Sequence, residues 1–235
     1  MNLILLFDTD FVATNRVRLT DRRFEHVRDI HRAHAGDEMC VGLLNGKMGK
    51  GSITAIGDDA VEMDVRLDQN PPPALPLTLI MALPRPNALK RSLICAASLG
   101  IKRIILLNFS RVEKGLWNSS ALRPEVIREH LVLGLEQGKD TVYPQVELRK
   151  RFKPFVEDEL PALAKGTLAL VAHPGTGKAS PKGVQGPTTL IIGPEGGIID
   201  YEIEQLTSLG FQTIDLGARI LRIESVLPYL VGKIF

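Results

Sequence analysis

The stretch LIIGPEGGIIDYE, residues 190–202, determines how the second half of this 235-residue chain is interpreted. A short apolar run ends at Gly193, and a helical pattern begins after Gly197. A simple turn needs one glycine or one proline, whereas this junction holds three glycines, a proline and Glu195. Such a composition indicates a loop that is shaped around a ligand.

The segments around this junction alternate between apolar strands and helices. Continuous apolar runs, which are typical of strands buried on both faces, occur at 77–83, 102–108, 166–173, 188–193 and 211–217. Helical patterns follow at 87–99, 124–137, 200–209 and 222–234. This alternation predicts an α/β fold in which helices cover a parallel sheet.

The first part of the chain is organised differently. Short strand candidates occur at 3–7, 16–19, 37–44, 51–56 and 61–67, together with one helix that Thr20 or Asp21 would cap. Short strands joined by turns predict a small β-barrel over residues 1–70. Four prolines between residues 71 and 76 cannot lie inside a sheet or helix, so this segment is expected to be a linker to a second domain, 77–235.

Composition and charge exclude several classes of protein. Cys40 and Cys95 are far apart and lie in apolar surroundings, so we expect neither a disulfide framework nor a zinc site. The apolar run at the N-terminus is too short for a signal peptide, and no stretch is long enough to span a bilayer. We therefore expect a cytoplasmic protein. The net charge of +2 does not by itself indicate a nucleic-acid partner.

One segment is nevertheless rich in arginine. Residues 16–32 contain three acids and six arginines: Arg16, Arg18, Arg22, Arg23, Arg28 and Arg32. These side chains either form a solvated face or contact phosphates of a nucleic acid.

Loops that follow strands of an open α/β sheet are where ligands bind. Three loops have this position, at 172–177, 193–197 and 216–222. None has the spacing of a nucleotide phosphate loop, and no G-x-S-x-G nucleophile motif is present. A carboxylate among glycines suits a neutral or cationic ligand better than a phosphate.

The combination of loops resembles a known family. LIIGPEGGIIDYEIEQLTSLGFQTIDLGARILRIES, residues 190–225, resembles the C-terminal signature of the RsmE family, which is GPEGG, a helix, and LG-x-RILR-x-E-[ST]. Upstream, further elements of the family pattern are matched by His26, Ile30, Arg32, Gly36-Asp37, Ser98 to Ile101, Glu136-Gln137 and Pro144. RsmE proteins are bacterial methyltransferases that act on N3 of a uridine in 16S ribosomal RNA.

The resemblance implies a fold, a cofactor and partners. It implies an N-terminal PUA-like β-barrel that binds RNA, and a SPOUT-type domain whose C-terminal chain threads a trefoil knot. It further implies S-adenosylmethionine held in the knot, 16S ribosomal RNA of the small subunit as substrate, and a homodimer. Neither a membrane nor a metal is implied.

The resemblance also assigns roles to residues of this chain. The cofactor would contact Ala172, His173, Ile192, Gly193, Pro194, Glu195, Gly196, Gly197, Leu216, Gly217, Ile220 and Leu221. Arg222 would stabilise the charge of the deprotonated base, and Glu195 or Glu224 would handle its proton. Alternatively, Arg222 and Glu224 form an ion pair that braces the fold. The arginines of residues 16–32 would hold the RNA backbone.

Several positions depart from the family pattern. Ile223, Val226 and Asp140 stand where Thr, a small residue and Arg are usual, and Ile199 replaces a Ser or Thr helix cap, which Asp200 would supply one residue later. These departures bear on the RNA target more than on the cofactor. Two alternatives remain: a methyltransferase of this fold with another RNA target, and a non-catalytic RNA-binding protein of ribosome assembly.

Overall fold

The computed structural model describes residues 1–235 and divides the chain into two compact units. Unit 1 is Met1–Pro73 together with Val132–Tyr143, and unit 2 is Ala74–Leu131 together with Pro144–Phe235. Helix α3 (Pro124–Gly138) therefore contributes residues to both units. The sequence did not predict the contribution of α3 to unit 1. The expectation that none of the four prolines lies inside a strand is wrong for Pro76, which lies in β7 (Leu75–Ala82) where the strand pairing is irregular. The domain functions stay predictions.

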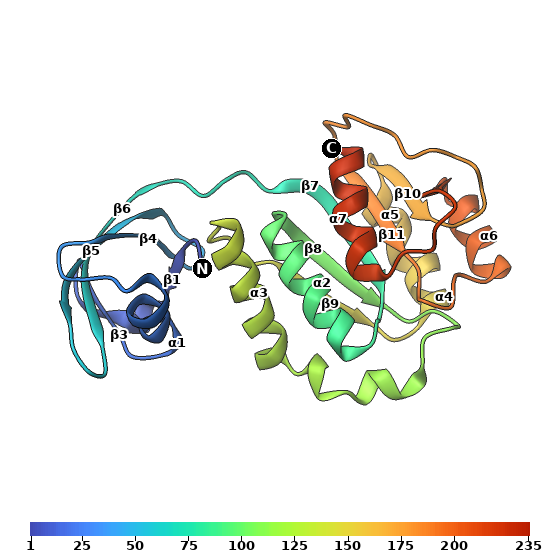
Figure 1. The fold of residues 1–235 in the computed structure, drawn as a ribbon. Coiled ribbons are helices and arrows are strands. Elements are labelled where there is room, and N and C mark those ends of the chain that lie inside the picture. The colour runs from blue at the N-terminus through green and yellow to red at the C-terminus, as the bar shows by residue number, and fades with distance from the viewer. The chain divides into compact units, whose positions relative to one another are not determined.

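Unit 1 is built on a curled, six-stranded half-barrel (Figure 1). Its strands are β1 (Ile4–Leu6), β2 (Phe11–Ala13), β3 (Arg16–Leu19), β4 (Glu38–Leu43), β5 (Met48–Ile56) and β6 (Val61–Gln69). They are ordered β1-β4-β5-β6-β3-β2, and only β1 and β4 pair in parallel. At Gly49 a Cβ atom would collide with the carbonyl oxygen of Arg66 on β6, so the close pairing of β5 with β6 requires glycine there.

The two faces of β1 are both buried, which explains why the sequence there is continuously apolar. Ile4 and Leu6 enter the main core of the half-barrel, whereas Leu3 and Leu5 pack with Leu135 of α3. Neighbouring side chains of a strand point to opposite faces, so the C-terminal half of α3 must cover the second face. This packing is what joins residues 132–143 to unit 1.

The helix expected after residue 20 begins at Arg22, and Asp21 caps it by accepting the backbone N–H of Arg23 at 2.9 Å. The cap predicted from the sequence is thus confirmed. The four-residue helix α1 (Arg22–Glu25) continues as a π-helical segment, His26–His31, which ends at Arg32 with a left-handed backbone (φ 50°).

Unit 2 contains a six-stranded sheet in which all strands are parallel, as the continuous apolar runs predicted. Its strands are β7 (Leu75–Ala82), β8 (Ile101–Leu107), β9 (Gln145–Arg149), β10 (Leu168–Ala172), β11 (Thr188–Ile192) and β12 (Gln212–Ile214). The order is β12-β10-β11-β7-β8-β9. The central strand β11 is buried at every residue.

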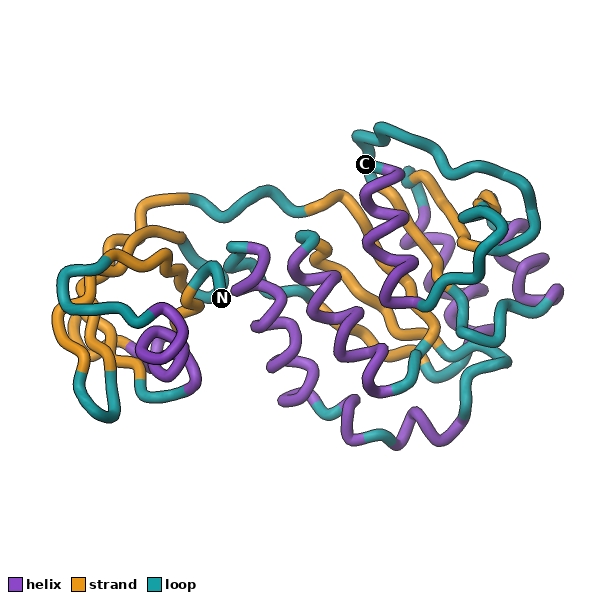
Figure 2. The backbone as a smooth tube through the Cα atoms, viewed as in Figure 1, coloured by secondary structure: helices purple, strands orange, loops and turns teal.

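Helices cover both faces of this sheet (Figure 2). Helices α2 (Pro86–Ser98) and α7 (Ile223–Ile234) pack side by side on one face, and α5 (Leu160–Ala164) lies on the other. Helix α6 (Asp200–Ser208) follows the GPEGG loop. The α/β class is therefore confirmed.

Strand β9 and the helical segment from α4 (Phe152–Pro154) through the π-helical residues Phe155–Glu159 were not predicted. β9 is an edge strand of alternating polar and apolar residues, so it lacks the continuous apolar run of its neighbours. None of the helices combines the length and the apolar character that a membrane span requires.

Candidate cofactor site

A cavity of about 920 Å³ lies at the carboxyl ends of four neighbouring strands of unit 2. Its walls come from the start of α2, which follows β7, and from the loops that follow β10, β11 and β12. This is the edge of a parallel sheet where α/β proteins bind ligands.

The structure brings the predicted cofactor and catalytic residues together around this cavity. The lining includes Ala172, His173, Ile192, Gly193, Pro194, Glu195, Gly196, Gly197, Leu216, Gly217, Ile220, Leu221, Arg222 and Glu224. It also includes residues that the sequence did not indicate, namely Arg85, Pro86, Asn87, Ala88 and Arg91 of the α2 region, and Asp215. Their roles toward a ligand stay predictions.

The glycines of the GPEGG loop are required by the geometry around them. A Cβ atom on Gly193 would collide with the side chain of Ile198, which is only 5% exposed. A Cβ atom on Gly196 would lie 3.3 Å from the Cβ and Cδ atoms of Arg111, and Gly197 has a φ of +79°. Close packing at Gly193 and Gly196, and the left-handed backbone at Gly197, therefore favour glycine at these three positions.

Two side chains fix the loop from outside the cavity. The carboxylate of Glu202, only 1% exposed, accepts the backbone N–H of Ser110 at 2.7 Å and that of Ile199 at 3.2 Å. Arg111 donates to the carbonyl oxygen of Gly196. The expectation that Asp200 caps α6 is wrong: Asp200 is its first residue, and Glu202 satisfies the N-terminal N–H instead.

Asp215, directly after β12, connects two of the loops. Its carboxylate accepts the backbone N–H of Gly217 at 2.9 Å and that of Gly177 at 3.1 Å. The hydrogen bonds from Gly217 and then Gly177 hold the pKa of Asp215 below its ordinary value. An ionised carboxylate thus joins the loop after β10 to the loop after β12.

His173 supplies a polar group that the protein leaves unpaired. Its Nδ1 atom is buried and has no hydrogen-bond partner, and the residue lines the cavity. A buried, unpaired nitrogen is costly unless a ligand or water satisfies it. Together with the bare backbone of the GPEGG loop, it gives the cavity the hydrogen-bonding groups and the space that a nucleoside-sized cofactor such as S-adenosylmethionine requires.

Charged side chains surround the mouth of the cavity. Arg91 contacts Glu224 at 3.4 Å, and Glu224 is 18% exposed. The alternative of an ion pair between Arg222 and Glu224 is wrong, because Glu224 pairs with Arg91 of α2. Arg222 is exposed at the N-cap of α7 and has no carboxylate partner, so its charge is available to a ligand.

The sequence profile of the RNA methyltransferase domain family matches residues 70–234. The chain belongs to this RNA methyltransferase family. A protein of Treponema pallidum (strain Nichols) named ribosomal RNA small subunit methyltransferase E is 28% identical over 229 residues, which are 94% of this chain and 86% of that protein. The resemblance to the RsmE family is thus confirmed.

Solved structures share the fold along almost the whole chain. A ribosomal RNA small subunit methyltransferase E from Neisseria gonorrhoeae, bound to S-adenosylmethionine, has a TM-score of 0.68 at 19% identity and covers 97% of this chain and 96% of its own. A methyltransferase of Legionella pneumophila in complex with the same cofactor has a TM-score of 0.70 at 22% identity, with coverages of 98% and 94%. The methyltransferase fold is confirmed by these likenesses.

Most of the arginines that were expected to hold RNA are ion-paired in this methyltransferase. Nearest-atom distances are 2.8 Å for Arg16–Asp64, 3.1 Å for Arg18–Asp59, 2.9 Å for Arg22–Glu136 and 2.6 Å for Arg28–Asp29. Arg32 is exposed and has no carboxylate partner. Pairing lowers the charge that this segment offers to a phosphate.

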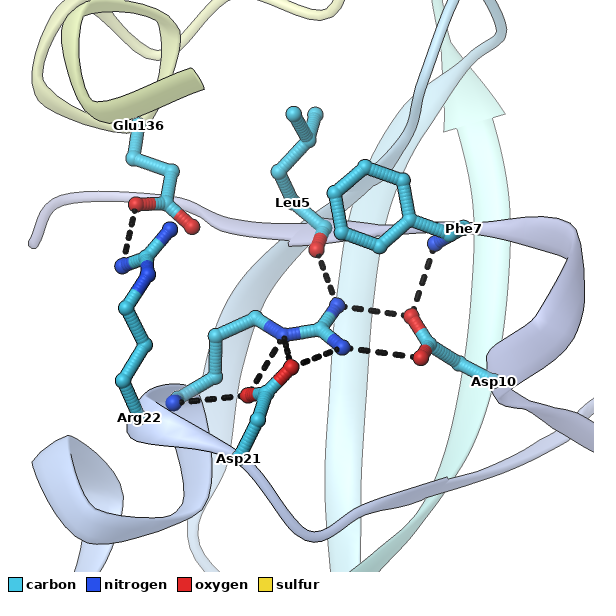
Figure 3. A network of polar contacts seen from close by, with 7 residues as sticks. Leu5, Phe7, Asp10, Asp21, Arg22 and Glu136 are labelled. Atoms are coloured by element: carbon cyan, nitrogen blue, oxygen red, sulfur yellow. Dashed lines mark hydrogen bonds and ion pairs between the residues drawn. The ribbon is translucent and has the colours of Figure 1, made fainter. Parts of the chain in front are cut away.

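Arg23 differs from the others because it is only 3% exposed. Its guanidinium donates to both carboxylate oxygens of Asp10, at 2.6 and 2.8 Å, to Asp21, and to the carbonyl oxygen of Leu5 (Figure 3). Its guanidinium is paired entirely with groups of unit 1. The prediction that Arg23 binds RNA is therefore wrong, and the residue stabilises the fold.

The long loop between β10 and β11 is bonded to the C-terminal segment of the methyltransferase domain at two places. Asp215 donates its N–H to the carbonyl oxygen of Lys178 at 2.7 Å, and Val184 donates to that of Ile234 at 2.8 Å. The loop therefore runs past both β12 and the end of α7. The threading of a trefoil knot stays a prediction.

Proposed function

We propose that this chain transfers a methyl group from S-adenosylmethionine to N3 of a uridine in 16S ribosomal RNA of the small ribosomal subunit. The observation that carries the proposal is the cavity at the carboxyl ends of β10, β11 and β12, with its glycine-lined wall and the unpaired Nδ1 of His173. The relatives named ribosomal RNA small subunit methyltransferase E, and their cofactor-bound structures, support it.

The cofactor contacts are proposed to come mainly from the backbone. Ile192 to Gly197 line the cavity with backbone that carries few side chains, and Leu216 and Gly217 line it as well. The adenine of the cofactor has both donors and acceptors on its edge, so such groups recognise it. When bound, the cofactor supplies a methyl group that its sulfonium has already activated.

The protein's own contribution is orientation and charge. Holding the uridine N3 in line with the methyl group supplies much of the rate. Loss of the N3 proton leaves a negative base, which the unpaired guanidinium of Arg222 stabilises. Glu195 is the better candidate for accepting the proton, because Glu224 already contacts Arg91.

RNA and a second copy of the chain are the proposed partners. In unit 1, Arg32 and the exposed faces of Arg16, Arg18, Arg22 and Arg28 are proposed to meet the RNA backbone, with Arg32 contributing most because it has no carboxylate partner. Ile220 is 88% exposed at the mouth of the cavity, which is compatible with a homodimer whose second copy covers it.

The cofactor step is tested by calorimetric titration of the purified protein with S-adenosylmethionine. Saturable binding is expected, and Gly196→Trp should abolish it, because a Cβ atom there lies 3.3 Å from Arg111 and an indole would force the loop that lines the cavity to move. Gly186→Trp is the matched control, since nothing lies within 4 Å of a Cβ atom at that position. A folded wild-type protein that binds no cofactor would contradict the proposal.

The reaction is tested with small ribosomal subunits that lack the modification. Nucleoside mass spectrometry after incubation with enzyme and cofactor should detect 3-methyluridine in the 16S RNA. A methyl group on another base or another RNA would replace the uridine target with the alternative target. Cofactor binding without any methylation would favour the non-catalytic alternative.

A further inference from the structure

A second, smaller hollow adjoins the cofactor cavity in unit 2. It has a volume of about 260 Å³ and lies between α2, the 3-10 turn η4 (Ser120–Leu122) and the first half of α3. Pro86 and Asn87 line both the hollow and the cofactor cavity, so the first turn of α2 separates the two. The proposed reaction uses no residue that lines only the hollow.

His130 gives this hollow a polar atom that no protein group engages. The residue is only 7% exposed, and its Nδ1 lies 2.6 Å from the carbonyl oxygen of Val126. A carbonyl can only accept, so Nδ1 carries a proton and the Nε2 of the neutral ring is an acceptor. No protein group pairs with Nε2, and His130 forms part of the wall.

The rest of the wall suits a flat, partly polar ring. Leu89, Leu93 and Val126 provide apolar surface, and the hydroxyl groups of Ser119 and Ser120 lie at its edge. Ser119 Oγ accepts the N–H of Ala121 at 3.2 Å, which leaves its own proton free to donate. A nucleobase has this combination of apolar faces and a hydrogen-bonding edge.

Positive charge lies beside the hollow, where the phosphate of a bound nucleotide would be. Lys90 lines the hollow, is exposed and has no carboxylate partner. Helix α2 is 13 residues long, and its first turn contains no acid and no side-chain cap. Free N–H groups and the helix dipole therefore favour an anion at its start, between the two cavities.

We propose that this hollow binds the nucleotide next to the methylated uridine, with its base against His130 and its phosphate near Lys90. The inference rests on the proposed function, because it takes the target nucleotide to lie in the cofactor cavity. The phosphate that joins the two nucleotides then lies at the N-terminus of α2. The hollow holds the RNA strand in register so that the target base enters the adjoining cavity.

The test compares two substitutions of His130, each of which places an amide group near the position of one imidazole nitrogen. Asn places its amide near the position of Nδ1, whereas Gln reaches the position of Nε2 and loses the contact with Val126. Affinity is measured by fluorescence anisotropy with a fluorescein-labelled uridine decamer. His130→Asn should weaken RNA binding about fivefold, the effect of one hydrogen bond, and His130→Gln should stay close to wild type.

Lys90→Met tests the phosphate contact through the salt dependence of RNA affinity. The slope of log affinity against log salt should fall by about 0.7, as expected when one contact to a single strand is lost. Lys165→Met, an exposed lysine of the same unit, is the control and should leave the slope unchanged. Affinity for S-adenosylmethionine should stay at the wild-type value in all four variants.

Three results would overturn the inference. One is unchanged RNA affinity in both His130→Asn and Lys90→Met. Another is a greater loss in His130→Gln than in His130→Asn, because the contact with Val126 would then be the role of the ring. A third is a parallel loss of cofactor affinity, which indicates a structural role. Failure of the wild-type protein to methylate RNA would instead contradict the proposed function, and the binding measurements do not depend on it.

Discussion

The carboxylate of Asp215 accepts the backbone N–H of Gly177 at 3.1 Å, although the two residues are 38 positions apart. The same carboxylate accepts the N–H of Gly217 two residues further along the chain. One side chain therefore sets the distance between two loops that line the cofactor cavity. The glycine loops alone would not be held at a fixed separation.

Replacing Asp215 should weaken cofactor binding. Asp215→Ala removes both hydrogen bonds, so the two loops must be ordered by the ligand itself, and affinity for S-adenosylmethionine should fall about tenfold. Calorimetry checks the affinity, with Asp158→Ala as the control because Asp158 is exposed in the same unit. An unchanged affinity would show that the loops keep their positions without the carboxylate.

Asp215 should also contribute to the stability of the protein, and the pH dependence of that contribution follows from its pKa. Its pKa lies below the ordinary value of 3.8, so the contribution is fully present above that value and is lost as pH falls through the lowered pKa. The difference in Tm between wild type and Asp215→Ala should therefore stay constant from about pH 8 to about pH 5 and shrink only in stronger acid. Thermal unfolding monitored by circular dichroism measures it, and a difference that shrinks near neutral pH would contradict this assignment.

Gly193 should tolerate no side chain. In Gly193→Ala the new methyl group collides with Ile198, which is buried and can move only by displacing the loop. Overpacking of this kind typically costs about 1–3 kcal/mol, and the displaced loop should reduce cofactor affinity at least about tenfold. Gly186→Ala has open space around it and should match wild type in both Tm and affinity. Equal behaviour of the two variants would show that the loop is not closely packed.

Substitutions of Arg23 and Arg16 should distinguish a buried, structural arginine from an exposed one by their effect on stability. Arg23→Leu leaves the buried carboxylate of Asp10 without its cation, with only the N–H of Phe7 donating to it, and breaking a buried ion pair in this way costs about 3–5 kcal/mol. Arg16→Leu breaks only an exposed pair with Asp64 and should change Tm little. Urea unfolding compares the two variants. Similar stabilities would show that the buried position of Arg23 is not essential to unit 1.

The loops of the cofactor cavity could be predicted from the sequence because their signal is local. Gly193 to Gly197 stand together in the chain, between an apolar strand and a helix, and the structure places them at the cavity. Arg91 and Asp215 could not be predicted in the same way. Their positions depend on α2 and on the loop at Gly177, and no local pattern indicates which distant segments meet.

The arginines of unit 1 show the same limit for predicting, from the sequence, how much charge is available to RNA. Between residues 16 and 32 the sequence shows an excess of arginine, but most of the carboxylates that neutralise it come from elsewhere in the chain. Asp64 is on β6, Asp10 precedes β2, and Glu136 is on α3. A local count of charge therefore overestimates what this segment offers to RNA, because pairing is decided by the fold.

Ionisation of the buried carboxyl group of Glu136 should lower the free energy of unfolding as pH rises. Its carboxylate is 1% exposed, and burial raises its pKa above the ordinary 4.5 even though Oε2 lies 2.9 Å from Nη1 of Arg22. Between the ordinary and the raised pKa the native state binds more protons than the unfolded state, so the free energy of unfolding falls with rising pH. Above the raised pKa that loss is complete.

Glu136→Gln keeps the shape of the side chain and removes the buried charge. The variant should be more stable than wild type at pH 8, by a few degrees in Tm, and the advantage should disappear toward pH 4, where the wild-type carboxyl group is protonated. Arg22 loses its partner at small cost because its side chain is 43% exposed and can be hydrated. Glu129→Gln, an exposed position on the same helix, should show no such dependence. A variant that is less stable than wild type at pH 8 would show instead that the attraction of Arg22 outweighs the cost of burial, and that the pKa of Glu136 is not raised.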